Sequence, residues 1–205
     1  MKKSDISIIF DENIPAEFFK DFENDVEVQG LNLVIESREP TGPMACAEWF
    51  ILPVVFAFIG KSYFDGFLKE MGKDHYQSMK ETLSNLTTKV MKPPRVEPTL
   101  FSTKGKISSR NPFSLAFSIL AEAEDGYTFK LLIPKTINGG DYSVITNEFM
   151  DFLSDYHLGF RTLESIGYVS EEYRPPSDII FVHYNPTNNS IEWLNEKKII
   201  DKYFT

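Results

Sequence analysis

The amino-acid sequence predicts an α+β fold in which a mainly antiparallel sheet packs against a long central helical segment, at about residues 44–91. Two hairpins, at about 113–134 and 179–194, predict the sheet, because apolar residues alternate along their strands and turn residues separate the strands. An apolar block followed by an amphipathic pattern predicts the helical segment. Hairpins with segregated helices favour α+β over a strictly alternating α/β order.

The first forty residues predict a strand, a helix and a second strand. Residues 6–10 (ISIIF) form a short β-rich run, and residues 31–35 (LNLVI) form another. Between them, Pro15 occupies a typical helix-start position before AEFFKDFEND, whose phenylalanines share one face. Two prolines and a glycine in residues 39–43 then predict a loop.

Residues 49–59 form an apolar block of eleven residues without a charge. A membrane-spanning helix needs roughly 20 apolar residues, and Pro53 would divide a helix at this place. We therefore predict no transmembrane segment and a buried core helix, with a membrane-dipping or partner-facing segment as the alternative.

Residues 61–90 predict an amphipathic helix. At about 100° per residue, the apolar residues fall on one stripe that includes His75. The basic residues of the polar surface share one edge: Lys69, Lys73 and Lys80. Glycine weakens helices, so a break near Gly72 with a second helix behind it is an equal alternative.

Residues 92–112 contain four prolines, and five bases against one acid. This composition predicts an extended connection rather than a helix or strand. We expect one domain over residues 1–205, with a subdivision near 92–112 as the alternative.

The second half of the chain is rich in predicted strands. Residues 125–126 (DG) are a hairpin turn signal, and residues 179–184 (IIFVHY) are apolar on both faces, as in a central strand. Asp141 is expected to cap a helix that ends before Gly159. Residues 195–204 predict a short closing helix.

Charge and composition restrict the classes of function. The chain has a net charge of −9, with 42% hydrophobic and 25% charged residues, which is ordinary for a globular protein. Ten acids stand against four bases in residues 1–40 and fourteen against seven in residues 111–205, whereas residues 41–110 carry six acids and ten bases. An acidic total argues against general nucleic-acid binding and fits a protein partner with a basic face.

The cysteine content predicts the compartment. A single cysteine, Cys46, excludes an intramolecular disulfide and favours a reducing environment. No apolar run follows the first three residues, so no secretory signal is predicted. We expect a cytoplasmic protein.

Motifs for cofactors, metals and nucleophiles are missing from the sequence. Residues 60–62 (GKS) match only the end of a phosphate-binding loop, because Val55 occupies the position that requires glycine. The three histidines lack the spacing of metal ligands, and Cys46 has the apolar neighbours of an inert buried thiol. We therefore expect no cofactor and no metal.

His183 and His75 are the candidate catalytic residues. His183 lies in an apolar predicted strand, where burial can bring its titration into the neutral range. A lone histidine on an apolar face, such as His75, is more often a packed and hydrogen-bonded side chain. Both histidines therefore retain a structural interpretation beside the catalytic one.

The candidate ligand- or partner-binding residues are all basic, and they come from the predicted helix edge and from the extended connection: Lys69, Lys73, Lys80, Lys104, Lys106 and Arg110. We expect such basic residues to neutralise the acidic ends of the same chain. The alternative is that they contact a phosphate or acidic ligand.

We therefore expect a non-enzymatic protein-binding factor, such as an inhibitor, immunity or regulatory protein, that uses an acidic surface. The alternative function is a small intracellular, hydrolase-like enzyme with an acid–base site of a histidine and a carboxylate. A third hypothesis is weak binding of RNA or phosphoinositide by Lys104 and Lys106. No oligomeric state is predicted.

Overall fold

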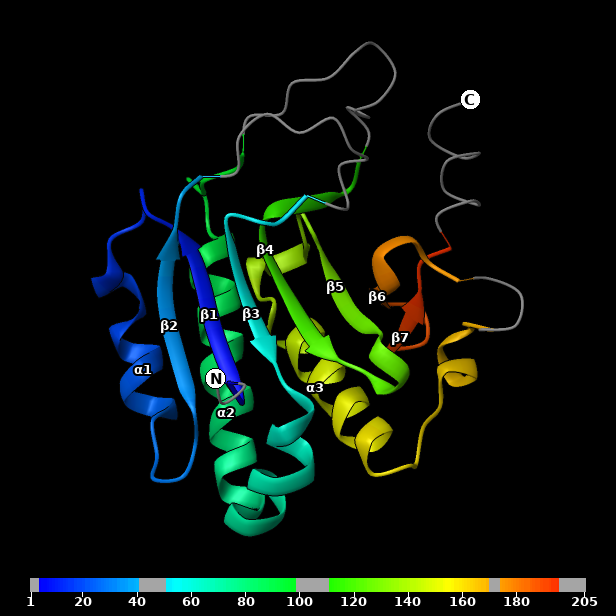
Figure 1. The fold of residues 1–205 in the computed structure, drawn as a ribbon. Coiled ribbons are helices and arrows are strands. Elements are labelled where there is room, and N and C mark those ends of the chain that lie inside the picture. Colours follow the sequence, from blue (N-terminus) through cyan, green and yellow to red (C-terminus); the bar gives the residue numbers. More distant parts are fainter. Residues whose placement is uncertain (1–3, 41–50, 99–110, 170–173, 196–205) are drawn as a thin grey trace.

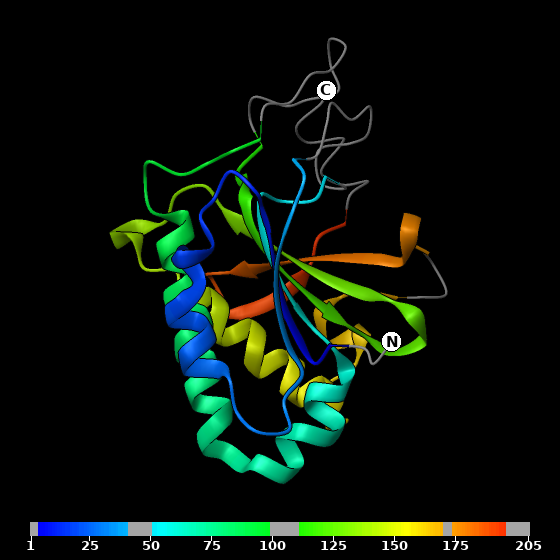
Figure 2. The ribbon, with the colours of Figure 1, turned by 60° about the vertical axis from the view of Figure 1, so that its left-hand side comes forward.

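The structure is a computed structural model that describes residues 4–40, 51–98, 111–169 and 174–195. In this part of the chain, seven strands form one mixed sheet in the order β2-β1-β3-β4-β5-β6-β7. Three α-helices pack against one face of this sheet (Figure 1 and Figure 2).

The strands are β1 (Ile6–Asp11), β2 (Leu33–Arg38), β3 (Val55–Ile59), β4 (Phe113–Glu122), β5 (Thr128–Pro134), β6 (Ile179–Asn185) and β7 (Ser190–Trp193). The helices are α1 (Lys20–Val26), α2 (Leu68–Met91) and α3 (Ser143–His157). Shorter helical turns include η1 (Ala16–Phe19), the π-helical η3 (Tyr63–Phe67) and η6 (Leu163–Ile166).

The sheet consists of three successive β-α-β units and one added strand. The units β1-α1-β2, β3-α2-β4 and β5-α3-β6 each contain a parallel strand pair, because the helix returns the chain to the starting end of the sheet. Neighbouring units meet through antiparallel pairs, and β7 is antiparallel to β6. The α+β class and both hairpins are confirmed, whereas the prediction of a mainly antiparallel sheet is wrong.

The predicted helical segment at 44–91 is wrong in its first part. Residues 55–59 form β3, which pairs with β1 and β4 in the middle of the sheet. Val55, Ala57 and Ile59 are completely buried on the helical side, and the phenylalanines between them lie on the opposite face. A strand with apolar residues on both faces has an uninterrupted apolar sequence, so its periodicity resembles that of a buried helix.

The remaining helical part is not one long helix. At Gly72 the backbone dihedrals are φ 78° and ψ −171°, a conformation that interrupts α2 and that glycine adopts without steric cost. The alternative with a break near Gly72 is therefore the correct one. Behind the break, Met79, Leu83 and Leu86 are buried in the core, as the apolar stripe predicts.

Helix α3 follows its prediction, except that Tyr142 and not Asp141 is the N-cap residue. The Oδ1 atom of Asp141 accepts a hydrogen bond of 2.9 Å from the backbone N–H of Ser143, the first residue of the helix. Gly159 has φ 78° directly behind the helix, and the N–H of Phe160 donates to the carbonyl of Asp155 at 2.8 Å. This is the usual glycine termination of a helix.

A second, smaller apolar cluster lies on the face of the sheet opposite the helices and contains Leu132, Phe181 and Leu194. Lys130 lies beside it and is only 2% exposed. Its Nζ atom donates to the carbonyl of Ile51 at 2.8 Å and lies 5.8 Å from the ring centroid of Phe181. This face is therefore partly buried around β5, β6 and β7.

Two further findings concern the predicted organisation. One sheet contains strands from both sides of the connection at 92–112. Among the described residues, no helix has the length and apolarity that crossing a bilayer requires. The closing helix predicted at 195–204 lies outside the described residues, except for its first residue.

Candidate functional site

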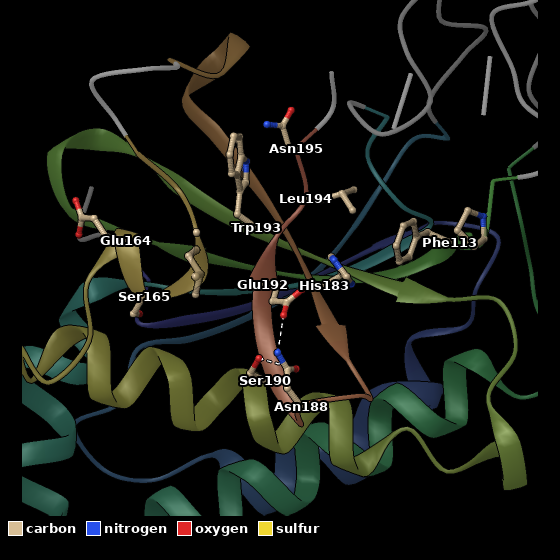
Figure 3. A pocket seen from close by; sticks show the side chains of 13 residues that line it. Phe113, Glu164, Ser165, His183, Asn188, Ser190, Glu192, Trp193, Leu194 and Asn195 are labelled. Atoms are coloured by element: carbon tan, nitrogen blue, oxygen red, sulfur yellow. Dashed lines mark hydrogen bonds between the residues drawn. The ribbon is translucent and has the colours of Figure 1, made fainter. Parts of the chain in front are cut away.

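A pocket of about 780 Å³ lies at the β7 edge of the sheet, between the β6–β7 hairpin and η6 (Figure 3). We call it the β7 pocket. It is lined by Pro112, Phe113, Glu164, Ser165, Ile166, Gly167, His183, Asn188, Ser190, Glu192, Trp193, Leu194 and Asn195.

The hairpin register places two titratable side chains next to each other in the β7 pocket. His183 on β6 stands opposite Glu192 on β7, so both side chains project from the same face of the sheet (Figure 3). The turn that connects β6 to β7 sets this register. In it, the side-chain oxygen of Asn185 accepts a hydrogen bond of 2.9 Å from the backbone N–H of Thr187, and Asn189 adopts φ 51°.

Glu192 is held by two asparagine amides. Its Oε1 atom accepts hydrogen bonds from Nδ2 of Asn188 at 2.6 Å and from Nδ2 of Asn185 at 3.0 Å. The bond from Asn188 is the main cause that lowers the pKa of Glu192, and the bond from Asn185 adds to it against the effect of burial. Glu192 is therefore ionised at neutral pH.

His183 is kept neutral in the same environment. Burial lowers its pKa, and this effect exceeds the opposing effects of the Tyr184 carbonyl and the Glu192 charge. Its Nδ1 atom lies 3.3 Å from the carbonyl oxygen of Tyr184, and its ring centroid lies 6.1 Å from that of Phe113. The imidazole therefore packs inside the pocket without a charge near pH 7.

Glu164 on η6 is a second carboxylate among the residues that line the pocket. Figure 3 shows Glu164 and Ser165 on an element apart from the hairpin. A hydrogen bond from Thr162 lowers the pKa of Glu164, so this side chain is also ionised. The apolar part of the wall includes Trp193, whose ring meets that of Tyr168 edge-on at 5.2 Å. The β7 pocket thus combines two anions with aromatic surface.

His75 lies elsewhere in the molecule. Its Nδ1 atom is 3.4 Å from the Tyr63 hydroxyl, and its Nε2 atom is 3.4 Å from the Val26 carbonyl. Burial raises the pKa of Tyr63, so this hydroxyl stays protonated. The ring of His75 therefore links α1, η3 and α2, and it does not line the β7 pocket.

The structure describes the side chain of only one of the six basic residues that were predicted to bind a ligand or partner, Lys80. The Nζ atom of Lys80 lies 2.7 Å from both carboxylate oxygens of Asp151 on α3, and the lysine side chain is 11% exposed. Lys69 and Lys73 are on either side of the break in α2, and their side chains lie outside the described part. The other members of the set are outside the described residues: Lys104, Lys106 and Arg110.

The residues of the GKS fragment have partners within the chain. The Nζ atom of Lys61 donates to the Glu124 carboxylate at 2.8 Å, and the hydroxyl of Ser62 donates to the Asp5 carboxylate. In the described ranges, no three His, Cys, Asp or Glu side chains are grouped as metal ligands would be. Cys46 lies outside these ranges.

Sequence reasoning found His183 but missed three other polar residues that line the pocket, Glu192, Asn188 and Glu164. A signal for Glu192 was present, because a turn between two alternating strands pairs residues on either side of it in a fixed order. The register across NPTNN leads from His183 to Glu192. For Glu164 there was none, because η6 reaches the pocket only through the tertiary fold.

Comparisons of the chain with protein-family models, with curated proteins and with solved structures find no match. The functional argument therefore starts from the geometry of the site.

Proposed function

We propose that this protein is a non-enzymatic factor that binds another protein, as an inhibitor, immunity or regulatory protein does, and that the β7 pocket receives basic side chains of that partner. One observation carries the proposal: the fully charged side chains that line the pocket are Glu164 and Glu192, with no lysine or arginine among the described lining residues.

The pocket chemistry suits a lysine or arginine side chain. Both carboxylates have lowered pKa values and stay ionised, whereas the lowered pKa of His183 keeps a competing positive charge out of the pocket. Trp193 and Phe113 supply aromatic surface for the aliphatic stem and for cation–π contact. The net charge of −9 attracts basic partners at longer range.

Selection from a library of random short peptides tests this proposal. We expect the wild-type protein to enrich peptides rich in lysine and arginine. The double variant Glu164→Gln/Glu192→Gln is expected to reduce that enrichment, because it removes both charges of the pocket and keeps the side-chain shapes. A matched control, Glu81→Gln/Glu124→Gln, changes two exposed carboxylates on α2 and on the turn between β4 and β5, and it is expected to select the same peptides as the wild type.

Two results would contradict the proposal: selected peptides without an excess of basic residues, or the same peptides selected by the double variant. Binding of single residues gives a second measurement. Chemical shifts of the Trp193 indole are expected to move with N-acetyl-arginine methylamide and to stay unchanged with N-acetyl-glutamate methylamide.

Acid–base catalysis of a hydrolase-like reaction is a second candidate function for the same pocket. It is favoured by one observation, the placement of His183 opposite Glu192 in a concave site. A neutral imidazole near pH 7 is the form that a general base requires. Against it, the Ser190 hydroxyl donates to Asn188 at 2.9 Å, so His183 does not activate that hydroxyl.

A panel of ester, amide and phosphoester substrates separates the two candidates. If His183 is a general base, the wild type turns over a substrate, and His183→Gln lowers kcat by roughly 10²–10⁴-fold. Absence of turnover by the wild type on the whole panel would reject catalysis and leave the binding proposal unaffected.

A further inference from the structure

Strand β2 forms the edge of the sheet opposite β7 (Figure 1). Within the described residues it pairs only with β1, along all six of its residues. An edge strand presents a row of backbone donors and acceptors to any chain that approaches it. We propose that β2 is a docking edge, to which an extended, basic segment of a partner protein adds as a further strand.

The hydrogen bonds to β1 show which backbone groups point outward. The carbonyl of Asn32 accepts from the N–H of Ile6 at 3.4 Å, and the carbonyl of Arg38 accepts from the N–H of Glu12 at 3.0 Å. In a parallel pair, alternate residues of one strand bond to the other strand. The N–H and C=O groups of Leu33, Ile35 and Ser37 therefore point away from β1.

Side chains hold this edge in place. Leu33 and Ile35 pack against the main core on the helical side, which fixes the strand and its register. Glu36 and Ser37 are exposed, and the rest of β2 is half-buried. Helix α1 lies in the helical layer beside β2 (Figure 2), so an added strand has a surface to pack on.

The charge around β2 defines the partner. Residues 11–39 contain nine acids against two bases. Eight of the nine carboxylates are exposed: Glu12, Glu17, Asp21, Glu23, Asp25, Glu27, Glu36 and Glu39. Lysines and arginines on an incoming strand would lie among these carboxylates, and such complementarity favours association.

The same charge disfavours a second copy of this chain as the occupant. Pairing of two β2 edges would bring together two segments that each carry seven net negative charges, including both copies of Glu36. Like charges on paired strands are destabilising. Natural proteins use edge charges in this way against self-association, and a basic segment is the occupant that these charges attract.

The inference rests on the proposed class of function, protein binding, but not on the β7 pocket. Amide hydrogen exchange by NMR tests it, with two peptides as probes: acetyl-KVKVKVK-amide and its acidic twin acetyl-EVEVEVE-amide. With the basic peptide, the amides of Leu33, Ile35 and Ser37 are expected to exchange at least roughly tenfold more slowly. The inward amides of Val34 and Glu36 report folding, and their exchange is expected to stay unchanged.

Charge variants complete the experiment. Glu36→Lys replaces attraction by repulsion at an exposed position and is expected to weaken the binding of the basic peptide by roughly three- to tenfold. Glu81→Lys makes the same change of charge at an exposed position of α2, outside β2 and the β7 pocket, and is expected to leave the protection of β2 unchanged. If the pocket proposal fails, this result at β2 still stands.

Three outcomes would overturn the inference. The first is binding of the basic peptide without slower exchange at Leu33, Ile35 and Ser37. The second is equal protection by the acidic peptide. The third is protection that rises with protein concentration in the absence of peptide, together with a dimer in sedimentation, since β2 would then pair with a second copy.

Discussion

Lys80 and Asp151 form an ion pair that joins α2 to α3, with Nζ of the lysine 2.7 Å from both carboxylate oxygens. The hydroxyl of Tyr76 donates to the same carboxylate at 3.2 Å. The pair is asymmetric in its exposure, because 11% of the lysine side chain and 50% of the aspartate side chain are accessible.

The exposure of this pair predicts a large effect of removing the aspartate. Asp151→Ala leaves a mostly buried ammonium group without its counter-charge and is expected to lower the free energy of unfolding by about 1–3 kcal/mol. Urea unfolding measures this change. Asp21→Ala is the control, because Asp21 and Lys89 form an exposed pair of 3.4 Å, and its effect is expected to be below about 1 kcal/mol. Equal losses in both variants would contradict the prediction.

A side chain at Gly60 is expected to destabilise the fold. A Cβ atom at this position would lie 2.8 Å from the backbone carbonyl oxygen of Ser4, so the turn behind β3 has to move. Gly60→Ala is expected to cost about 1–3 kcal/mol of unfolding free energy. Gly66→Ala is the matched control, because a Cβ there meets no atom within 4 Å. If thermal denaturation shows the same loss for both variants, the close contact at Gly60 is not the cause.

Two histidines are expected to make the fold sensitive to mild acid. Burial lowers the pKa of both His157 and His183 from the ordinary 6.5. The unfolded chain therefore binds more protons than the folded chain as the pH falls through about 6.5, and stability decreases in that window. The lowered carboxylate pKa values of Glu164 and Glu192 act at lower pH, below their ordinary 4.5.

Chemical denaturation at a series of pH values between neutral and mildly acidic measures this dependence. His157→Asn and His183→Asn are each expected to reduce the loss of stability on acidification, because asparagine does not titrate. A pH dependence that neither variant changes would show that other groups cause it.

Glu97 is expected to fasten the start of the 92–112 connection to β4. Its carboxylate accepts hydrogen bonds from the Leu115 N–H at 2.8 Å and from Nε of Arg95 at 2.7 Å, and also from the Ser114 hydroxyl. Glu97→Ala is expected to cost about 1–3 kcal/mol of unfolding free energy, because a backbone N–H and a cation lose their acceptor. Glu12→Ala, at an exposed carboxylate, is the control and is expected to change stability by less than about 0.5 kcal/mol.

The sequence predicted those strands and helices whose apolar residues recur at one regular spacing. Strand β1 and helix α3 have the alternation or the helical stripe that residue patterns reveal. In β4, a register shift between Phe113 and Ser118 interrupts the predicted alternation. Strand β3 was missed because both of its faces are apolar. The parallel strand pairs were missed because one helix separates the two strands of each pair in the sequence. Residue patterns within a strand do not indicate which distant strand it pairs with.

The candidate site was predictable to a smaller extent. His183 stood out as a rare titratable residue in an apolar strand, and the turn behind it was recognised. The position of Lys80 against α3 depends on the packing of two helices, and a helical projection of α2 alone places it on a solvated edge. Tertiary contacts of this kind, including the approach of η6 to the β7 pocket, are not encoded in a local period.

The place of β1 in the sheet has a consequence for synthesis of the chain. Strand β1 pairs on one side with β2 and on the other with β3, where Ile8 is opposite Ala57. The β4–β5 hairpin closes over a short turn, whereas the β1–β3 pair has to close the loop between Phe10 and Val55, which slows folding. On the ribosome, the unit β1-α1-β2 emerges before β3, and the inner edge of β1 stays unpaired until residues 55–59 have left the exit tunnel.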